Sequence, residues 1–280
     1  MPEAVNRIFV FIFGTIVGSF LNVCIYRLPK DASIVKPRSF CPHCKTPILF
    51  YDNIPIISFI LLRGKCRSCK EKISLRYPLV ELITAIIFLA LYLHLGLSWQ
   101  LAKYMFFFSL LIVVSFIDID YHAIPAYLCF IGIVMGLLFE AIATVNLLKA
   151  GQLTSLELMP IYISLQGLIF GMGFTYLFKF FGDILLSIYL GFRKKESIEG
   201  EKESLGLGDV DFMGLVGVFL GIKAVIVVFF LAPFFALLYS AGALFFKKSH
   251  LIPYLPYLSL ATAVFFFWGN QILRFIGFTF

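Results

Sequence analysis

Two pairs of acidic residues stand beside long apolar segments. The first pair is Asp118 and Asp120, within SFIDIDYHAIP, and the second is Asp209 and Asp211, within LGLGDVDFMG. When two carboxylates lie close together, one keeps its proton, so the charged one can activate water while its neighbour donates to a substrate carbonyl. The pairs are therefore candidates for the chemistry of an aspartic protease. Asp120 lies two positions after Asp118, on a different helix face, and is expected to be a supporting acid.

A purely structural role for the second pair also stays open. Asp209 and Asp211 begin an apolar segment, where the free amide groups of a helix start favour acidic side chains. Gly206 and Gly208 then simply belong to a loop. Against this, carboxylates at membrane depth are costly and usually mark function. In a catalytic site the two glycines would let a substrate backbone approach where a side chain would block it.

Four cysteines form two C-x-x-C motifs. Cys41 and Cys44 belong to CPHC, Cys66 and Cys69 belong to CRSC, and 21 residues separate the motifs. Each motif can present two thiolates to one ion, so the two together would complete a tetrahedral zinc shell. Redox chemistry of a dithiol is the alternative for a C-x-x-C motif. Two disulfides are not expected in a cytoplasmic loop.

The composition places the chain in a membrane. Of its 280 residues, 61% are hydrophobic and 14% are charged, which is more apolar side chain than a soluble domain can bury. Several runs approach the roughly 20 apolar residues that span a bilayer as a helix. We therefore expect an all-α polytopic membrane protein with a small zinc-ribbon-like cytoplasmic domain. The expected spans are about eight, at residues 7–26, 79–97, 101–117, 125–146, 159–190, 209–222, 223–246 and 254–279.

Basic residues set the expected orientation. Ten Lys and Arg residues lie between Leu28 and Pro78, and two further basic clusters lie in residues 191–208 and at Lys247 and Lys248. Eight spans with the N-terminus outside would put all three clusters, and both acidic pairs, on the cytoplasmic side. The positive charge would then face anionic lipid, and no nucleic-acid partner is expected.

The fifth apolar segment carries two further patterns. Lys179 and Asp183 are four residues apart, so we expect them to neutralise each other on one helix face. Gly167, Gly171 and Gly173 have the small-residue spacing that allows close contact between helices.

Six stretches, taken in order, are similar to those of one family. From the first apolar segment to about residue 221, the chain resembles bacterial type IV prepilin peptidases. The stretches are GSFLNV at Gly18–Val23 followed by Arg27 and Pro29, the paired C-x-x-C motifs, DNIP at Asp52–Pro55, ISLRYPLVEL at Ile73–Leu82, DIDYHAIP and GLGD.

The resemblance implies an enzyme of the bacterial cytoplasmic (inner) membrane with two activities. Such enzymes cut the short basic leader from type IV prepilin or pseudopilin precursors at the cytoplasmic face. They then methylate the new N-terminal amine with S-adenosylmethionine. The family's catalytic aspartates correspond to Asp118 and Asp209, and its zinc ligands to the four cysteines. The family commonly has Lys two residues after the second aspartate, where this chain has Asp211.

The resemblance also implies a division of labour along the chain. Residues 1–27 form the first helix, residues 28–78 a zinc-binding domain and candidate methyltransferase region, and residues 79–280 a membrane peptidase domain with seven helices. Residues 28–78 are too few for a Rossmann domain and lack its Gly-rich pattern. A methyl-donor site would therefore be built partly from membrane helices or their ends.

Two other classes of protein could use these residues. A proton-coupled transporter could use the acids as a relay, which predicts acids near the bilayer midplane and discontinuous spans. A non-catalytic assembly scaffold could carry the cysteine site and would need neither acid. The expected position of both acidic pairs at the cytoplasmic ends of spans favours the enzyme.

Overall fold

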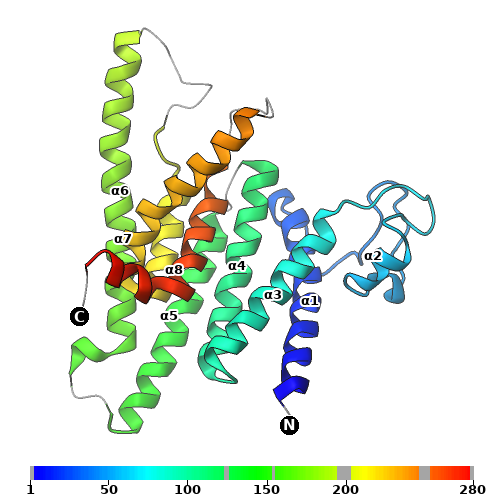
Figure 1. The fold of residues 1–280 in the computed structure, drawn as a ribbon, viewed down its shortest axis with the longest axis horizontal. Coiled ribbons are helices and arrows are strands. Elements are labelled where there is room, and N and C mark those ends of the chain that lie inside the picture. Colours follow the sequence, from blue (N-terminus) through cyan, green and yellow to red (C-terminus); the bar gives the residue numbers. More distant parts are fainter. Residues whose placement is uncertain (1–2, 123–125, 153–154, 194–202, 246–252, 278–280) are drawn as a thin grey trace. The chain divides into compact units, whose positions relative to one another are not determined.

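The computed structural model describes residues 3–122, 126–152, 155–193, 203–245 and 253–277. Helices account for most of these residues, and the only extended pairings among them are two isolated β-bridges (Figure 1). The α-helices are α1 (Glu3–Arg27), α2 (Ile57–Leu61), α3 (Arg76–Leu95), α4 (Trp99–Tyr121), α5 (Ala126–Lys149), α6 (Pro160–Arg193), α7 (Leu207–Phe245) and α8 (Leu255–Phe275). Short 3-10 helices occupy Leu28–Lys30, Phe50–Asn53 and Leu156–Leu158.

Six of the described helices are long and apolar enough to cross a membrane: α1, α3, α4, α5, α6 and α7. The expected all-α polytopic membrane architecture is therefore confirmed. The expected spans 209–222 and 223–246 both fall on α7, apart from residue 246, and α7 breaks at Gly221, where φ is 77°, next to the expected boundary between them. The remaining expected span corresponds to α8. This helix is long enough but is not among the six, because polar residues such as Asn270, Gln271 and Arg274 lower its hydropathy.

The chain divides into two compact units, Met1–Tyr121 and His122–Phe280. In the first unit, α1, α3 and α4 pack against one another. Two glycines of α1 set the approach of α3. A Cβ on Gly14 would lie 2.6 Å from the Ala85 Cα, and one on Gly18 would lie 2.7 Å from the Glu81 Cα. Only small residues at these positions allow the two backbones to come so close.

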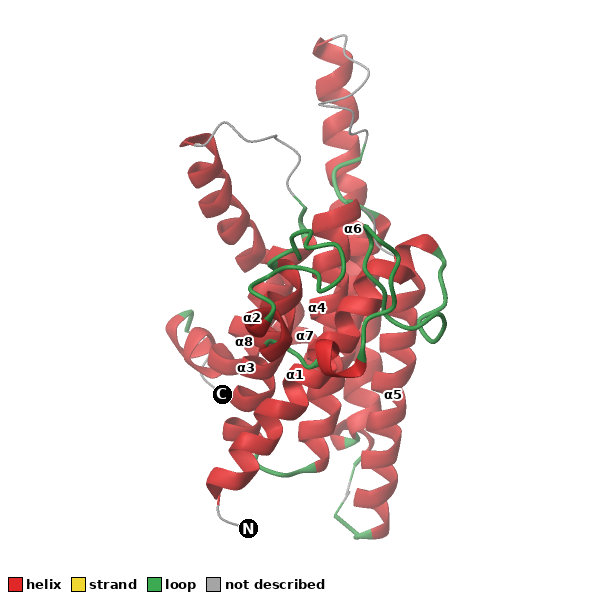
Figure 2. Cartoon of the chain, turned by 90° about the vertical axis from the view of Figure 1, so that its right-hand side faces the viewer, coloured by secondary structure: helices red, strands yellow, loops and turns green. Residues whose placement is uncertain are grey.

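The segment between α1 and α3 is mostly loop, with the short α2 inside it (Figure 2). Two buried polar residues of α1 form hydrogen bonds with the two ends of this segment. The Arg27 guanidinium donates to the carbonyl oxygens of Ser33 and Pro37, both at 2.7 Å. The Asn22 amide donates to the Tyr77 carbonyl at 3.0 Å. The loop therefore leaves α1 and returns to α3 in a fixed path.

In the second unit, α7 packs against α5, α6 and α8. A Cβ on Gly167 of α6 would lie 2.0 Å from the Gly217 carbonyl oxygen, and one on Gly171 would lie 2.4 Å from that of Met213. The expected close contact is confirmed for these two glycines. It is wrong for Gly173, which has nothing within 4 Å of an added Cβ, because a residue two positions further along a helix points to another side.

Each unit has its own apolar core. The first core lies between α1, α3 and α4, and the second is dominated by α7. Fully buried side chains of the first include Ile25, Val80, Phe88, Leu91, Phe107, Phe108 and Ile117, and those of the second include Phe212, Met213 and Leu215.

Candidate active site and metal centre

The structure brings the four cysteines together. Their sulfur atoms all lie within 4.8 Å of one another, and the Sγ atoms are 3.9 Å apart for Cys41 and Cys69 and 4.0 Å apart for Cys44 and Cys66. A tetrahedral zinc site with Zn–S bonds of about 2.3 Å requires sulfur atoms about 3.8 Å apart. A disulfide requires about 2.05 Å, and all four thiols are free. The geometry therefore fits one metal ion held by four thiolates.

The two C-x-x-C turns have the same backbone construction. In each, the first cysteine N–H donates to a carbonyl five residues on, at 3.0 Å from Cys41 and 2.8 Å from Cys66. The N–H of Lys45 or Lys70 then donates back to the carbonyl of that cysteine. Both lysines have positive φ, 60° and 62°. Isolated antiparallel bridges flank the turns, at Phe40 with Pro47 and at Lys65 with Lys72. Two matching knuckles thus aim their thiols at one point.

Local hydrogen bonds favour the thiolate form of one cysteine in each knuckle. The side chain and backbone of Thr46 lower the pKa of Cys44 to about 6. The backbone of Cys69 and of Ser68 lowers the pKa of Cys66. Because the thiolate is the form that binds metals, these bonds favour metal binding by Cys44 and Cys66. In contrast, burial and the neighbouring thiols raise the pKa of Cys69 to about 11.

An open pocket of about 1630 Å³ lies within the first unit, beside the cysteine loop and the adjoining parts of α1 and α3. Glu81 is buried there, and its Oε2 accepts the Ile56 N–H at 2.7 Å. Asp52 accepts two hydrogen bonds from the Arg67 guanidinium, which lowers the pKa of Asp52. The polar lining includes Asn22, Tyr26, His43, Asp52, Glu81 and Asp120.

The first acidic pair lies near the end of α4. Asp118 is 8% exposed, whereas Asp120 is exposed and forms an ion pair with Arg76 at the start of α3. The different burial follows from their two-residue spacing on a helix. The arginine neutralises Asp120, so the first unit presents Asp118 as its buried acid in this region.

The second acidic pair lies in the first turns of α7. Asp209 is 8% exposed, and its Oδ2 accepts the Gly206 N–H at 3.0 Å, while its own N–H donates to the Gly206 carbonyl at 3.1 Å. Asp209 therefore caps the helix start. A carboxylate can accept several hydrogen bonds, so this cap is compatible with catalysis. Gly208 and Asp211 are half-buried in the same turns.

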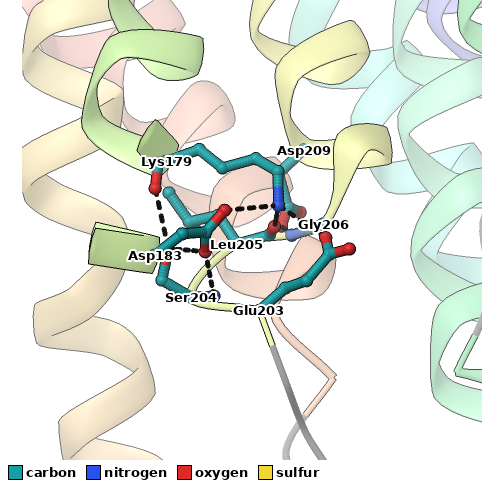
Figure 3. A network of polar contacts seen from close by, with 7 residues as sticks. All are labelled: Lys179, Asp183, Glu203, Ser204, Leu205, Gly206 and Asp209. Atoms are coloured by element: carbon teal, nitrogen blue, oxygen red, sulfur yellow. Dashed lines mark hydrogen bonds and ion pairs between the residues drawn. The ribbon is translucent and has the colours of Figure 1, made fainter. Parts of the chain in front are cut away.

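The loop before α7 is held by two charged residues of α6 (Figure 3). The expected neutralisation is confirmed, since Lys179 Nζ lies 3.1 Å from Asp183 Oδ2. Lys179 Nζ also reaches Glu203 at 2.5 Å and donates to the Leu205 carbonyl at 2.7 Å. Asp183 Oδ1 accepts both the N–H and the hydroxyl of Ser204, at 2.7 and 2.8 Å. The sequence pattern did not predict these contacts to the loop.

The two buried aspartates belong to different units. Asp118 lies near the end of the first unit, and Asp209 lies in the second. Their pairing in one site therefore stays a prediction.

The fold and these sites define a multi-pass membrane protein with a four-cysteine centre and a buried acid in each unit. Residues 12–95, which include the cysteines, match the bacterial peptidase A24 N-terminal domain. Residues 105–241, which include Asp118 and Asp209, match the type IV leader peptidase family. The chain belongs to the type IV leader peptidase family.

Curated relatives resemble the chain over most of its length. A protein named prepilin leader peptidase/N-methyltransferase from Aeromonas hydrophila is 32% identical over 95% of this chain and 91% of its own. A protein of the same name from Bacillus subtilis is 32% identical over 95% of both chains. One from Neisseria gonorrhoeae is 32% identical over 81% of this chain and 78% of its own. No solved structure matches the chain.

Proposed function

We propose that this chain is a membrane aspartic endopeptidase that removes the basic leader from type IV prepilin or pseudopilin precursors and then methylates the new N-terminus. The observation that carries the proposal is the match to the type IV leader peptidase family over residues 105–241, which contain the buried aspartates Asp118 and Asp209. The relatives that cover nearly the whole chain have both activities in their names. A proton-coupled transporter and a non-catalytic scaffold are not favoured by these matches.

The peptidase step uses Asp118 and Asp209 as a pair sharing one proton. The ionised acid accepts a proton from water as the water oxygen attacks the scissile carbonyl carbon. The protonated acid donates to the carbonyl oxygen. The tetrahedral intermediate then collapses, its C–N bond breaks, and the leaving nitrogen takes a proton from the pair. The products are a leader with a new carboxylate and a mature chain with a free amine.

Gly206 and Gly208 support this step in different ways. The Gly206 N–H fixes one oxygen of Asp209. Gly208 lies in the first turn of α7, one position before Asp209, where the absence of a side chain would let a substrate backbone approach. Asp120 and Asp211 are supporting acids in this scheme.

The site is proposed to face the cytoplasm of a bacterial inner membrane. The support is the clustering of Lys and Arg in residues 28–78 and 191–208, which the six apolar helices, with the N-terminus outside, place on the same side of the membrane. A precursor with a basic leader and an apolar helix would present its scissile bond at the membrane surface, with the leader in water and the helix in lipid. The lipid bilayer is thus a partner of the reaction, and no nucleic acid is required.

The four cysteines are proposed to hold a structural zinc ion. They would fill all four positions of a tetrahedron, which is the arrangement of structural rather than catalytic zinc. The loop they fasten has little core of its own, since large apolar side chains such as Val35, Phe50 and Leu61 are exposed. Redox chemistry is less favoured, because the sulfur contacts at 3.9 and 4.0 Å join the two knuckles and all four sulfur atoms lie around one point.

The pocket of the first unit is proposed to take the methyl donor. S-adenosylmethionine carries a positively charged sulfonium, which supplies the methyl group, and a carboxylate is the natural partner for a cation of this kind. Asp52 and Asp120 are paired with arginines, whereas Glu81 is bound through a backbone N–H. Glu81 is therefore the residue proposed to attract the donor. Its place on α3, beside α1, makes a site built partly from helices.

One assay tests both halves of the proposal. The purified chain in lipid is incubated with a pilin-like precursor and a labelled methyl donor, and the product N-terminus is sequenced and weighed. We expect cleavage at the junction of leader and apolar segment, and one added methyl group on the new amine. An intact precursor, under conditions in which one of the curated relatives cleaves it, would rule out the peptidase. Proton transport without precursor would favour the transporter.

A further inference from the structure

One peptide group, Leu205–Gly206 in the loop before α7, contacts both Lys179 of α6 and Asp209 of α7. The carbonyl oxygen of Leu205 accepts a hydrogen bond from Lys179 Nζ at 2.7 Å. The N–H of Gly206 donates to Asp209 Oδ2 at 3.0 Å. This carbonyl and this N–H are the two ends of the same planar peptide unit. Lys179 and Asp209 are thus connected by two hydrogen bonds, one at each end of the Leu205–Gly206 peptide group.

This arrangement strengthens the bond to the acid. A cation on a carbonyl oxygen draws electrons from the amide, and hydrogen bonds in a chain polarise one another. The N–H at the far end then becomes a better donor, and its partner here is a carboxylate, which makes the bond charge-assisted. The planar peptide also fixes the direction of the N–H once its oxygen is held.

We propose that Lys179 is a positioning residue of the peptidase site: it orients and polarises the Leu205–Gly206 peptide, which in turn holds the Asp209 carboxylate. The inference rests on the proposed peptidase function. Lys179 acts through the peptide and is given no contact with the substrate.

The surroundings of Lys179 keep it charged and in place. Lys179 is only 7% exposed. Because a buried charge is costly unless it is paired, its ammonium group needs nearby carboxylates. Asp183 supplies one at 3.1 Å and Glu203 another at 2.5 Å. Asp183 also binds Ser204, so the loop is held on both sides of the Glu203–Ser204 peptide.

The helix beneath the loop is a firm support. A Cβ on Gly182 would lie 2.5 Å from the Ser204 hydroxyl, so the loop rests directly on α6. About three turns along α6 from Gly182, Gly171 brings α6 against the backbone of α7 at Met213. The loop therefore spans two helices whose separation is already set, and Lys179 transmits that geometry to the start of α7.

The test compares steady-state cleavage by variants of the full chain in lipid. Lys179→Met removes the charge and the donor but keeps an unbranched apolar stem. We expect kcat to fall about 100-fold, the cost of a small displacement of a catalytic group, with KM unchanged. Lys179→Arg keeps charge and donors and should recover much of the loss. Lys223→Met, at an exposed lysine of α7, is the control and should leave kcat unchanged.

Two further measurements guard against a folding defect. Ser204→Ala removes one contact to Asp183 without exposing a buried charge, and it should lower kcat several-fold at constant KM. Lys179→Met added to Asp209→Asn should cause no further loss, because the only route by which Lys179 acts is already removed. A purely structural role would instead lower the amount of folded protein in both backgrounds, with unchanged kcat per folded molecule.

The outcomes separate the two levels of the proposal. If the wild-type chain leaves the precursor uncut, the peptidase function itself is wrong. If the wild type cleaves and Asp209→Asn abolishes cleavage, but Lys179→Met retains the wild-type kcat, only the positioning role of Lys179 is overturned. An equal loss in Lys179→Met and Lys179→Arg would also overturn it, because Arg keeps the proposed interaction.

Discussion

The cysteine loop of the first unit and the short loop before α7 meet the same need in different ways. Each is a polar segment that must hold a fixed position beside apolar helices. The cysteine loop is long and has little core, so its two knuckles converge on one point through four thiols. The loop before α7 is short, and Lys179 and Asp183 fasten it to a helix that already packs against α7. A long loop with little core needs a crosslink within itself, whereas a short loop can be held in place by hydrogen bonds to the helices beside it.

The comparison predicts that damage to one region spares the other. The two loops belong to different compact units, and the polar contacts described for each lie within its own unit. Cleavage should depend mainly on the acids and the loop before α7. Methylation should depend also on the cysteine loop and its pocket.

The largest effect is expected from the acids. Asp118→Asn and Asp209→Asn each remove an ionisable group while keeping side-chain size, and each should lower the cleavage rate at least about 1000-fold. Rates are measured at matched amounts of folded protein. Asp120→Asn and Asp211→Asn serve as neighbouring controls and should be milder. Near-normal cleavage by either of the first two variants would break the proposed pair.

A smaller effect on cleavage and a large one on methylation are expected from Cys66→Ser. Loss of one thiolate should release the metal and loosen the loop, because four ligands hold it together. Metal analysis should show less zinc than in the wild type. Methylation should fall more than cleavage. Full zinc occupancy in Cys66→Ser would exclude Cys66 as a ligand.

The contact between α6 and α7 gives a prediction on stability. Gly167→Ala places a Cβ 2.0 Å from a backbone oxygen, whereas Gly173→Ala meets nothing within 4 Å. The first should lower the free energy of unfolding by about 1–3 kcal/mol through forced separation of the helices. The second should leave it nearly unchanged. Unfolding in detergent compares the pair, and equal stability would show that the helices do not pack as described.

The smallest effect is expected from the pocket. Glu81→Gln keeps the shape of the side chain but removes its charge, so the KM for S-adenosylmethionine should rise about tenfold, the equivalent of about 1.4 kcal/mol. Cleavage should be unaffected. Asp31→Asn, outside the pocket lining, is the control for a change in loop charge. An unchanged KM in Glu81→Gln would move the donor site elsewhere.

Local patterns in the sequence predict much of this molecule. Apolar runs predict the membrane helices because a bilayer imposes their length. The C-x-x-C spacing predicts the metal site because each motif forms a turn of its own. The helix cap by Asp209 could also be foreseen, since only the glycine-rich start of one helix is involved.

Contacts between distant segments were harder to foresee. The hydrogen bond from Lys179 to the Leu205 carbonyl joins two residues 26 positions apart. It depends on which side of α6 faces the loop before α7, and no local sequence spacing predicts this. The break at Gly221, by contrast, lies within one residue of the expected boundary between the spans 209–222 and 223–246, because the two apolar runs have the lengths of separate helices. The signal that was available, a Lys and an Asp kept inside an apolar helix, predicted their mutual pairing but not the loop they hold.

A paired assay shows whether the chain carries two activities that can be separated. Asp209→Asn and Cys66→Ser are each given an intact precursor and, separately, an already cleaved pilin, with labelled S-adenosylmethionine, and the products are weighed. The account predicts that Asp209→Asn leaves the precursor uncut but methylates the cleaved pilin, and that Cys66→Ser cuts the precursor but methylates neither substrate efficiently. Loss of both activities in both folded variants would contradict it.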